Sequence, residues 1–131
     1  MMSLAEVTFP GGKKVDVDIK GLKVKTDQPK LSGGDGTAPS PFDLFFASIA
    51  SCSGFYALSF CQSKGIETEG LKVSLDVDKD EEKGLISKIN IEVTLPEQFP
   101  DKYKDAILRS IDLCTVKKNI LNAPDFNLEL K

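Results

Sequence analysis

Apolar and polar residues alternate in three short stretches near the start of the chain. Residues 4–9 alternate up to Phe9, and residues 15–19 and 22–25 place Val, Ile and Leu between charged residues. A period of two is typical of strands that bury one face. Glycine-containing turns separate the stretches, so the pattern predicts a three-stranded meander. Residues 27–38 are rich in Gly and Pro and predict a plain loop rather than a phosphate cradle.

A run without any charged residue follows, from residue 44 to residue 63. Ser40 suits an N-cap, Pro41 suits the first helical position, and Asp43 completes a capping box. Lys64 and Gly65 suit the end of a helix. The pattern therefore predicts one long helix that begins at Pro41 and ends near Lys64. A helix that is apolar on every side is buried on every side.

The length of this run would suffice to cross a bilayer. Serines, Gly54 and Gln62 interrupt it, however, and no cluster of basic residues flanks it. The rest of the chain has the amphipathic pattern of a soluble domain. These features favour a buried helix over a membrane span, in a core larger than one such chain builds alone.

The second half of the chain returns to alternation. Residues 71–77 and 89–95 predict a hairpin whose apolar face covers the long helix. Helical spacing follows over residues 103–121, with a possible break near Asp112, and residues 126–130 alternate as a last strand. The predicted order is βββ-α-ββ-α-β, an α+β fold in a single domain over residues 1–131.

Composition excludes several classes of protein. The net charge of −3 argues against a nucleic-acid partner. The N-terminus lacks the pattern of a signal peptide, so we expect a cytoplasmic protein, in which three cysteines are unlikely to form a disulfide framework. Histidine is absent, which removes Cys-His pairs and most zinc sites. No P-loop or dinucleotide fingerprint occurs. We therefore expect no metal and no organic cofactor.

The three cysteines are the candidate reactive groups. Cys52 and Cys61 are nine residues apart on the predicted helix, roughly 13 Å along its axis, which is too far for a disulfide. Cys114 is the one possible intrachain partner for either. If a helix restarts with Asp112 as its N-cap, Cys114 lies in the first turn, where a thiolate is stabilised; Lys117 adds to this and Asp112 opposes it. Alternatively, all three are small buried hydrophobic residues.

Small side chains surround Cys52. Ser51, Ser53 and Gly54 leave room for a molecule to approach the sulfur. Tyr56 lies one helical turn further on and either lines this approach or belongs to the core.

Two motifs resemble those of the OsmC/Ohr family. Residues 41–53 place Cys52 eleven residues after a proline in an apolar helix, and Cys114-Thr115-Val116-Lys117-Lys118 resembles the family's Cys-Pro-Val-Ser-(Lys/Arg). The predicted order of elements agrees, so the resemblance covers nearly the whole chain. It implies an intertwined homodimer in which two long central helices cross. It also implies thiol-dependent peroxide reduction, with Cys52 attacking the peroxide and Cys114 resolving the sulfenic acid as a disulfide.

The chain departs from the family motifs at the residues that activate the thiol. Phe42 stands where the family has glutamate, and Thr115 stands where it has proline. No arginine matches the one that activates the thiolate; the lysines at 13, 14 and 117 and Arg109 are the available substitutes. The segment 38–41 resembles the less characterised OsmC-like branch. Because desolvation raises a thiol pKa, we expect a slow peroxidase whose rate climbs above neutral pH.

The main hypothesis is thus a cytoplasmic homodimer that reduces organic hydroperoxides or related oxidants with Cys52 and Cys114. An unidentified thiol reductant would regenerate it, without a membrane or nucleic-acid partner. The alternative is a non-catalytic OsmC-like module with structural cysteines that binds a small apolar ligand at the dimer interface.

Overall fold

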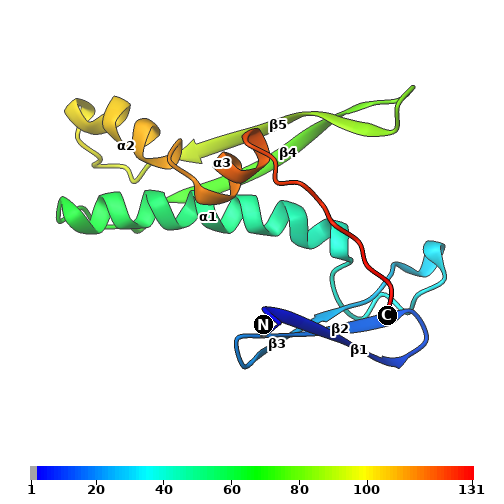
Figure 1. Cartoon of the computed structure of the whole chain (residues 1–131). Helices are drawn as coiled ribbons and strands as arrows, with labels where there is room; N and C mark the ends of the chain where they lie inside the picture. The colour runs from blue at the N-terminus through cyan, green and yellow to red at the C-terminus, as the bar shows by residue number, and fades with distance from the viewer. Residues whose placement is uncertain (1–2) are drawn as a thin grey trace. The chain divides into compact units, whose positions relative to one another are not determined.

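The computed structural model describes residues 3–131 (Figure 1). Two compact units make up the chain, Met1–Ala47 and Ser48–Lys131. The long helix α1, Pro41–Ser63, begins in the first unit and continues into the second. The fold is α+β, as predicted, with one three-stranded and one two-stranded antiparallel sheet.

The first unit contains the predicted meander. Its strands are β1 Ala5–Gly11, β2 Lys14–Ile19 and β3 Leu22–Thr26, in the order β1-β2-β3 (Figure 1). Val17 lies opposite Val7 on one side and Val24 on the other, so the apolar residues of all three strands share one face of the sheet. Val7 and Phe9 nevertheless remain exposed, so the sheet itself does not bury them.

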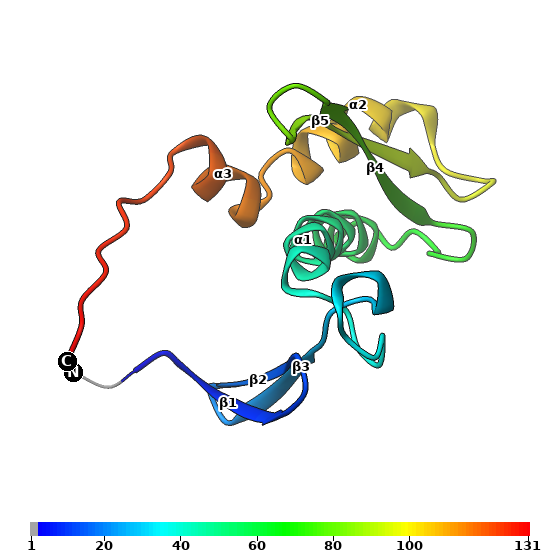
Figure 2. The same cartoon turned by 90° about the vertical axis from the view of Figure 1, so that its right-hand side faces the viewer.

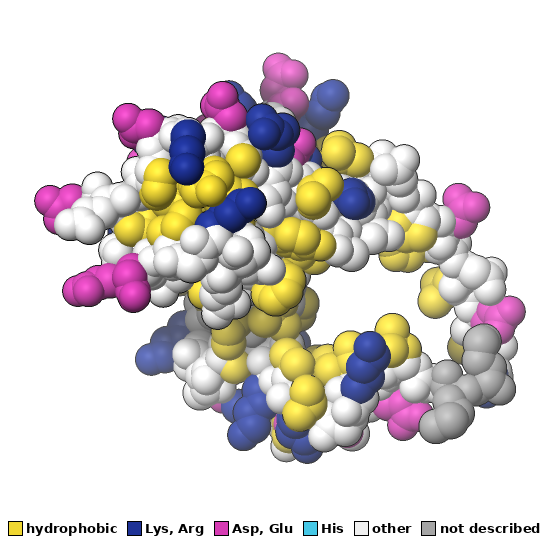
Figure 3. Space-filling view, turned by 90° about the vertical axis from the view of Figure 1, so that its left-hand side faces the viewer, with side chains coloured by type: hydrophobic (Ala, Val, Ile, Leu, Met, Phe, Trp, Pro, Cys, Tyr) yellow, Lys and Arg dark blue, Asp and Glu magenta, His cyan; other side chains and the backbone are white. Residues whose placement is uncertain are grey.

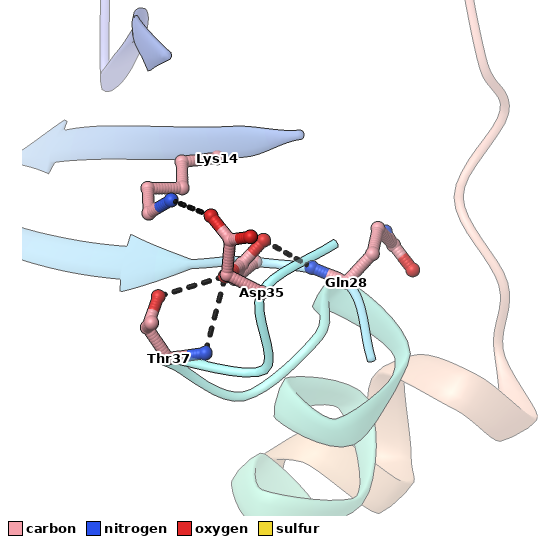
Figure 4. A network of polar contacts seen from close by, with 5 residues as sticks. Lys14, Gln28, Asp35 and Thr37 are labelled. Carbon is pink, nitrogen blue, oxygen red and sulfur yellow. Dashed lines mark hydrogen bonds and ion pairs between the residues drawn. The ribbon is translucent and has the colours of Figure 1, made fainter. Parts of the chain in front are cut away.

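The segment after β3 is a closed loop, as predicted, with a short 3₁₀ turn, η1, at Lys30–Ser32. Asp27 is buried at its start and accepts hydrogen bonds from the Gln28 N–H (2.7 Å) and from the Thr37 N–H (3.1 Å) and hydroxyl (2.7 Å) (Figure 4). Gly34 packs so closely on the Gln28 carbonyl that a side chain there would collide with it. Asp27 thus ties the two ends of the loop together.

Both ends of α1 form as the sequence predicts. The Ser40 hydroxyl accepts from the Asp43 N–H (3.1 Å), and the Asp43 carboxylate accepts from the Ser40 N–H (2.9 Å), which is a capping box. At the other end the N–H groups of Gly65 and Ile66 bond to the carbonyls of Gln62 and Cys61, a Schellman motif. By length and composition α1 also satisfies the criteria for a membrane span, as core helices of soluble proteins often do.

The second unit packs a hairpin and two short helices against α1. The strands β4 Lys72–Asp80 and β5 Leu85–Thr94 form the predicted hairpin, and η2 Asp101–Tyr103, α2 Lys104–Ile111 and α3 Thr115–Leu121 follow (Figures 1 and 2). The buried residues of α1 recur every four positions and so lie on one face: Ile49, Ser53, Ala57 and Cys61. The core consists of Ala57, Cys61, Phe99, Ile107 and Ile111.

The end of the predicted order βββ-α-ββ-α-β is wrong. The second helix is split into α2 and α3 at the break near Asp112, which the sequence had indicated. No strand forms over residues 126–130, and Phe126, Leu128 and Leu130 are 95–99% exposed. A strand is stable only when its backbone pairs with a neighbour, and this segment pairs with no strand in the described part of its own chain.

Candidate active site

The second unit brings Cys52 and Cys114 together. Cys52 lies on α1 and is partly exposed, whereas Cys114 is buried and serves as the N-cap of α3. Both are free thiols. The Cys114 thiol lies close enough to Cys52 to lower the pKa of its thiol, so two cysteines 62 positions apart in sequence are neighbours in space.

The start of α3 differs from the prediction. Asp112 ends α2 in a helical conformation, and Cys114, with φ −43° and ψ 119°, is the N-cap. Two tight turns cause the offset: the N–H groups of Leu113 and Cys114 bond to carbonyls three residues back. The Cys114 sulfur accepts a hydrogen bond from the Lys117 N–H at 3.4 Å, as an N-cap side chain does.

The first turn of α3 supplies donors to both sulfurs. A helix leaves its first N–H groups without internal partners, and here those of Thr115 and Val116 reach Cys52. Desolvation raises the pKa of Cys52, but the Val116 N–H, the Cys114 thiol and the Thr115 N–H together lower it, and the net pKa lies below the usual value of a cysteine. The expectation that burial would leave this pKa raised is therefore wrong, because backbone donors from a distant segment outweigh it.

Cys61 has a different environment. It is 0% exposed within the core of the second unit, and burial raises the pKa of its thiol. Of the three cysteines it best fits the interpretation as a small buried hydrophobic residue.

A second contact joins α1 to α3 beside the two sulfurs. The hydroxyls of Tyr56 and Thr115 share a hydrogen bond of 3.2 Å. The sequence placed Tyr56 one turn beyond Cys52 but left its role open, and it marked Thr115 only as a departure from a motif. A proline at position 115 would supply neither the hydroxyl nor the N–H that reaches Cys52.

Two of the four cations that were candidates to replace the missing arginine are paired with carboxylates. The Lys14 ammonium pairs with Asp35 at 2.6 Å in the first unit (Figure 4), and the Lys117 ammonium pairs with Asp112. Neither lysine contributes to the lowered pKa of Cys52. Hydrogen-bond donors therefore account for the lowered pKa of the thiol.

Other possible sites are few. Among residues 3–131, no group of three or more Cys, Asp or Glu side chains is arranged to hold a metal ion. An open cavity of about 820 Å³ lies at the C-terminal end of α1, lined by residues such as Lys64, Glu67, Glu97 and Lys102. Its lining mixes charged and apolar side chains and includes neither Cys52 nor Cys114.

Comparison with known proteins adds the following. Residues 34–129 match the family model described as OsmC-like protein. One solved structure with a similar fold is that of a putative osmotic stress induced and detoxification response protein from Psychrobacter arcticus (23% identity, 91% of this chain and 88% of that chain, TM-score 0.75). Others are an OsmC-like protein of unknown function from Vibrio cholerae (14%, 88% and 90%, TM-score 0.62) and an organic hydroperoxide resistance protein of Bacillus subtilis (23%, 97% and 97%, TM-score 0.50). These likenesses establish a shared fold. Curated protein sequences give no match.

Proposed function

Because this chain belongs to the OsmC-like family, we propose that it reduces organic hydroperoxides or related oxidants, with Cys52 as the attacking thiol and Cys114 as the resolving thiol. The observation that carries the proposal is that the start of α3 lies against Cys52 of α1. It brings the Cys114 thiol and the N–H groups of Thr115 and Val116 close to the Cys52 sulfur. Distant relatives of the same fold, such as the Bacillus subtilis protein, are organic hydroperoxide resistance proteins.

The proposed reaction has two steps on the protein. The Cys52 thiolate attacks the outer oxygen of the hydroperoxide, the O–O bond breaks, and the alkoxide leaves as an alcohol after taking a proton. Cys52 becomes a sulfenic acid. The Cys114 thiolate then attacks that sulfur, water leaves, and a Cys52–Cys114 disulfide forms. An external thiol reductant supplies two electrons and two protons to restore both thiols.

The donors around Cys52 support the first step. A thiolate is the nucleophile, and its fraction at a given pH rises as the thiol pKa falls. The N–H groups of Thr115 and Val116 stabilise the charged form without any charged side chain. They would take the role that an arginine held by a glutamate plays in the motif that this chain lacks.

The open apolar faces support a homodimer. Only 22% of the most apolar stretch of α1 is buried within the chain, and Phe55 and Leu58 on α1 are exposed. Figure 3 shows hydrophobic side chains lying open at the surface in this view. Exposed apolar surface of this extent is typical of an interaction site, and a second copy of the chain would cover it. A monomeric mass by light scattering at micromolar concentration would contradict the dimer.

The activity is tested by following an organic hydroperoxide, such as cumene hydroperoxide, with a dithiol reductant. We expect Cys52→Ser to abolish consumption of the peroxide and Cys114→Ser to stop disulfide formation while leaving a sulfenic acid on Cys52. Cys61→Ala is the matched control and should retain activity. Peptide mapping of the oxidised wild type should give a Cys52–Cys114 link. If Cys52→Ser consumed peroxide as fast as the wild type, the non-catalytic alternative would replace the proposal.

A further inference from the structure

Tyr56 and Thr115 form a second bridge between the two elements that hold the sulfurs. Tyr56 is four residues after Cys52 on α1, and Thr115 directly follows Cys114 at the start of α3. Their hydroxyls lie 3.2 Å apart. The bridge between hydroxyls therefore runs beside the contact between sulfurs, displaced by one helical turn along α1.

Thr115 takes part in both contacts. Its hydroxyl bonds to Tyr56, and its backbone N–H reaches the Cys52 sulfur. A hydrogen bond weakens steeply when donor and acceptor lose their alignment, so the N–H donors act on the sulfur only while the first turn of α3 keeps its place. That turn follows a three-residue break after α2 and belongs to a helix of seven residues, which has little stability of its own.

We propose that Tyr56 and Thr115 are positioning residues, and that the hydrogen bond between their hydroxyls holds the first turn of α3 against the Cys52 sulfur. The inference deepens the proposed function, since it rests on Cys52 as the reacting thiol. Without the bond, the turn moves away from α1 and the N–H groups of Thr115 and Val116 no longer reach the Cys52 sulfur. The fraction of Cys52 present as thiolate then falls.

The groups that face Cys52 limit what else can act on it. The donors come from Cys114, Thr115 and Val116, and Tyr56 is the other titratable side chain on the same part of α1. The nearby charges of Asp112 and Lys117 are paired with each other. A change in the pH response of Cys52 after loss of the Tyr56 or Thr115 hydroxyl therefore reports on the placement of the α3 turn.

The test measures how fast iodoacetamide alkylates Cys52 between pH 5 and pH 10 in the full chain, with mass spectrometry of the Cys52 peptide. Tyr56→Phe and Thr115→Val each remove one hydroxyl and keep the shape. We expect each to move the midpoint upward and to slow alkylation at pH 7 about two- to fivefold, because the thiolate fraction falls. Thr115→Ser keeps the hydroxyl and should match the wild type.

Two further variants sharpen the result. Thr115→Pro removes both the hydroxyl and the N–H, and should slow alkylation at pH 7 about tenfold. Proline is well tolerated at the first position of a helix, and the ψ of 119° at Cys114 already lies outside the helical region, so this variant should fold. The double variant Tyr56→Phe/Thr115→Val should behave like either single variant, because all three lack the same bond.

Several outcomes would overturn the proposal. One is that the hydroxyl variants melt at a lower temperature yet keep the alkylation profile of the wild type, which would leave the bond a purely structural role. Others are unchanged profiles in both single variants, or effects that add in the double variant. The alkylation assay needs no peroxide. A shifted profile in a protein that fails to reduce peroxides would therefore uphold the positioning role while refuting the proposed function.

Discussion

Cys52 and Cys61 lie nine residues apart on α1, in the same uncharged run, yet the pKa values of their thiols are shifted in opposite directions. Cys61 packs in the core, where burial alone raises the pKa of its thiol. Cys52 is also desolvated, but α3 presents N–H groups and a thiol to its sulfur, and the pKa of Cys52 is lowered. Both cysteines lie in a stretch without any charged residue, so the opposite shifts arise from what the rest of the chain places against each sulfur.

The contrast shows how a helix without charge accommodates a reactive thiol. Backbone N–H groups carry partial positive charge, yet they bring no side chain that must itself be desolvated. A short helix whose first turn abuts the sulfur is therefore enough to oppose the cost of burial. Where no such turn is present, as at Cys61, the cysteine stays neutral and serves packing.

The largest expected difference between the two cysteines is their rate of alkylation in the native protein. At pH 7 we expect iodoacetamide to modify Cys52 at least about a hundredfold faster than Cys61. Cys61 is fully buried, so its reaction requires an opening of the structure that costs several kcal/mol. Mass spectrometry of the two peptides over time measures both rates in one sample.

Urea provides the control for this comparison. In a denaturing concentration of urea both thiols lose their environment, and the two rates should converge. If Cys61 reacted as fast as Cys52 in the native protein, the difference in environment would be refuted.

The sequence predicted the features that depend on neighbouring residues. The capping box at Ser40 and Asp43 and the glycine end at Gly65 follow from local chemistry, and both form. The strand alternation also gave both sheets, because each strand pairs with the next one along the chain. The cysteine pair came from motifs that resemble a family, and the structure brings the two residues together.

Features that depend on distant contacts were not predictable in this way. Asp112 is a common N-cap residue and Cys114 is not, yet two tight turns move the cap to Cys114. Residues 126–130 alternate like a strand but have no pairing edge in the described part of their chain. The pKa of Cys52 was expected to be raised by desolvation. The donors that lower it lie more than 60 positions away in the sequence, so no local pattern indicated them.

A second prediction concerns stability. We expect Cys61→Ser to lower the free energy of unfolding by about 1–3 kcal/mol, because a hydroxyl without a partner is placed in the core. Cys52→Ser, at a partly exposed position, should cost about 0.5 kcal/mol or less. Urea denaturation followed by circular dichroism measures both. Equal losses of unfolding free energy would mean that the two positions are equally buried, which would contradict the difference drawn between Cys52 and Cys61.

The smallest expected effect tests the same rule on a carboxylate in the first unit. Asp27 is 1% exposed, and the Thr37 hydroxyl, the Thr37 N–H and the Gln28 N–H lower its pKa to about 2, against the opposing effect of desolvation. The folded pKa lies below the unfolded one, so this stabilisation is present above about pH 4 and is lost as the pH falls through about 2. We expect Asp27→Asn to lower the melting temperature at pH 6 and to differ less from the wild type at pH 2.

Two variants make this last prediction specific to the hydrogen-bond donors. Thr37→Val removes one donor to Asp27 and should reproduce part of the loss at pH 6. Asp35→Asn removes an exposed carboxylate that pairs with Lys14, and a surface ion pair contributes little, so its melting temperature should stay close to that of the wild type at both pH values. If Asp27→Asn lost as much stability at pH 2 as at pH 6, the ionised carboxylate would not be the group that the loop stabilises. The rule drawn from Cys52 and Cys61 would then apply to the thiols alone.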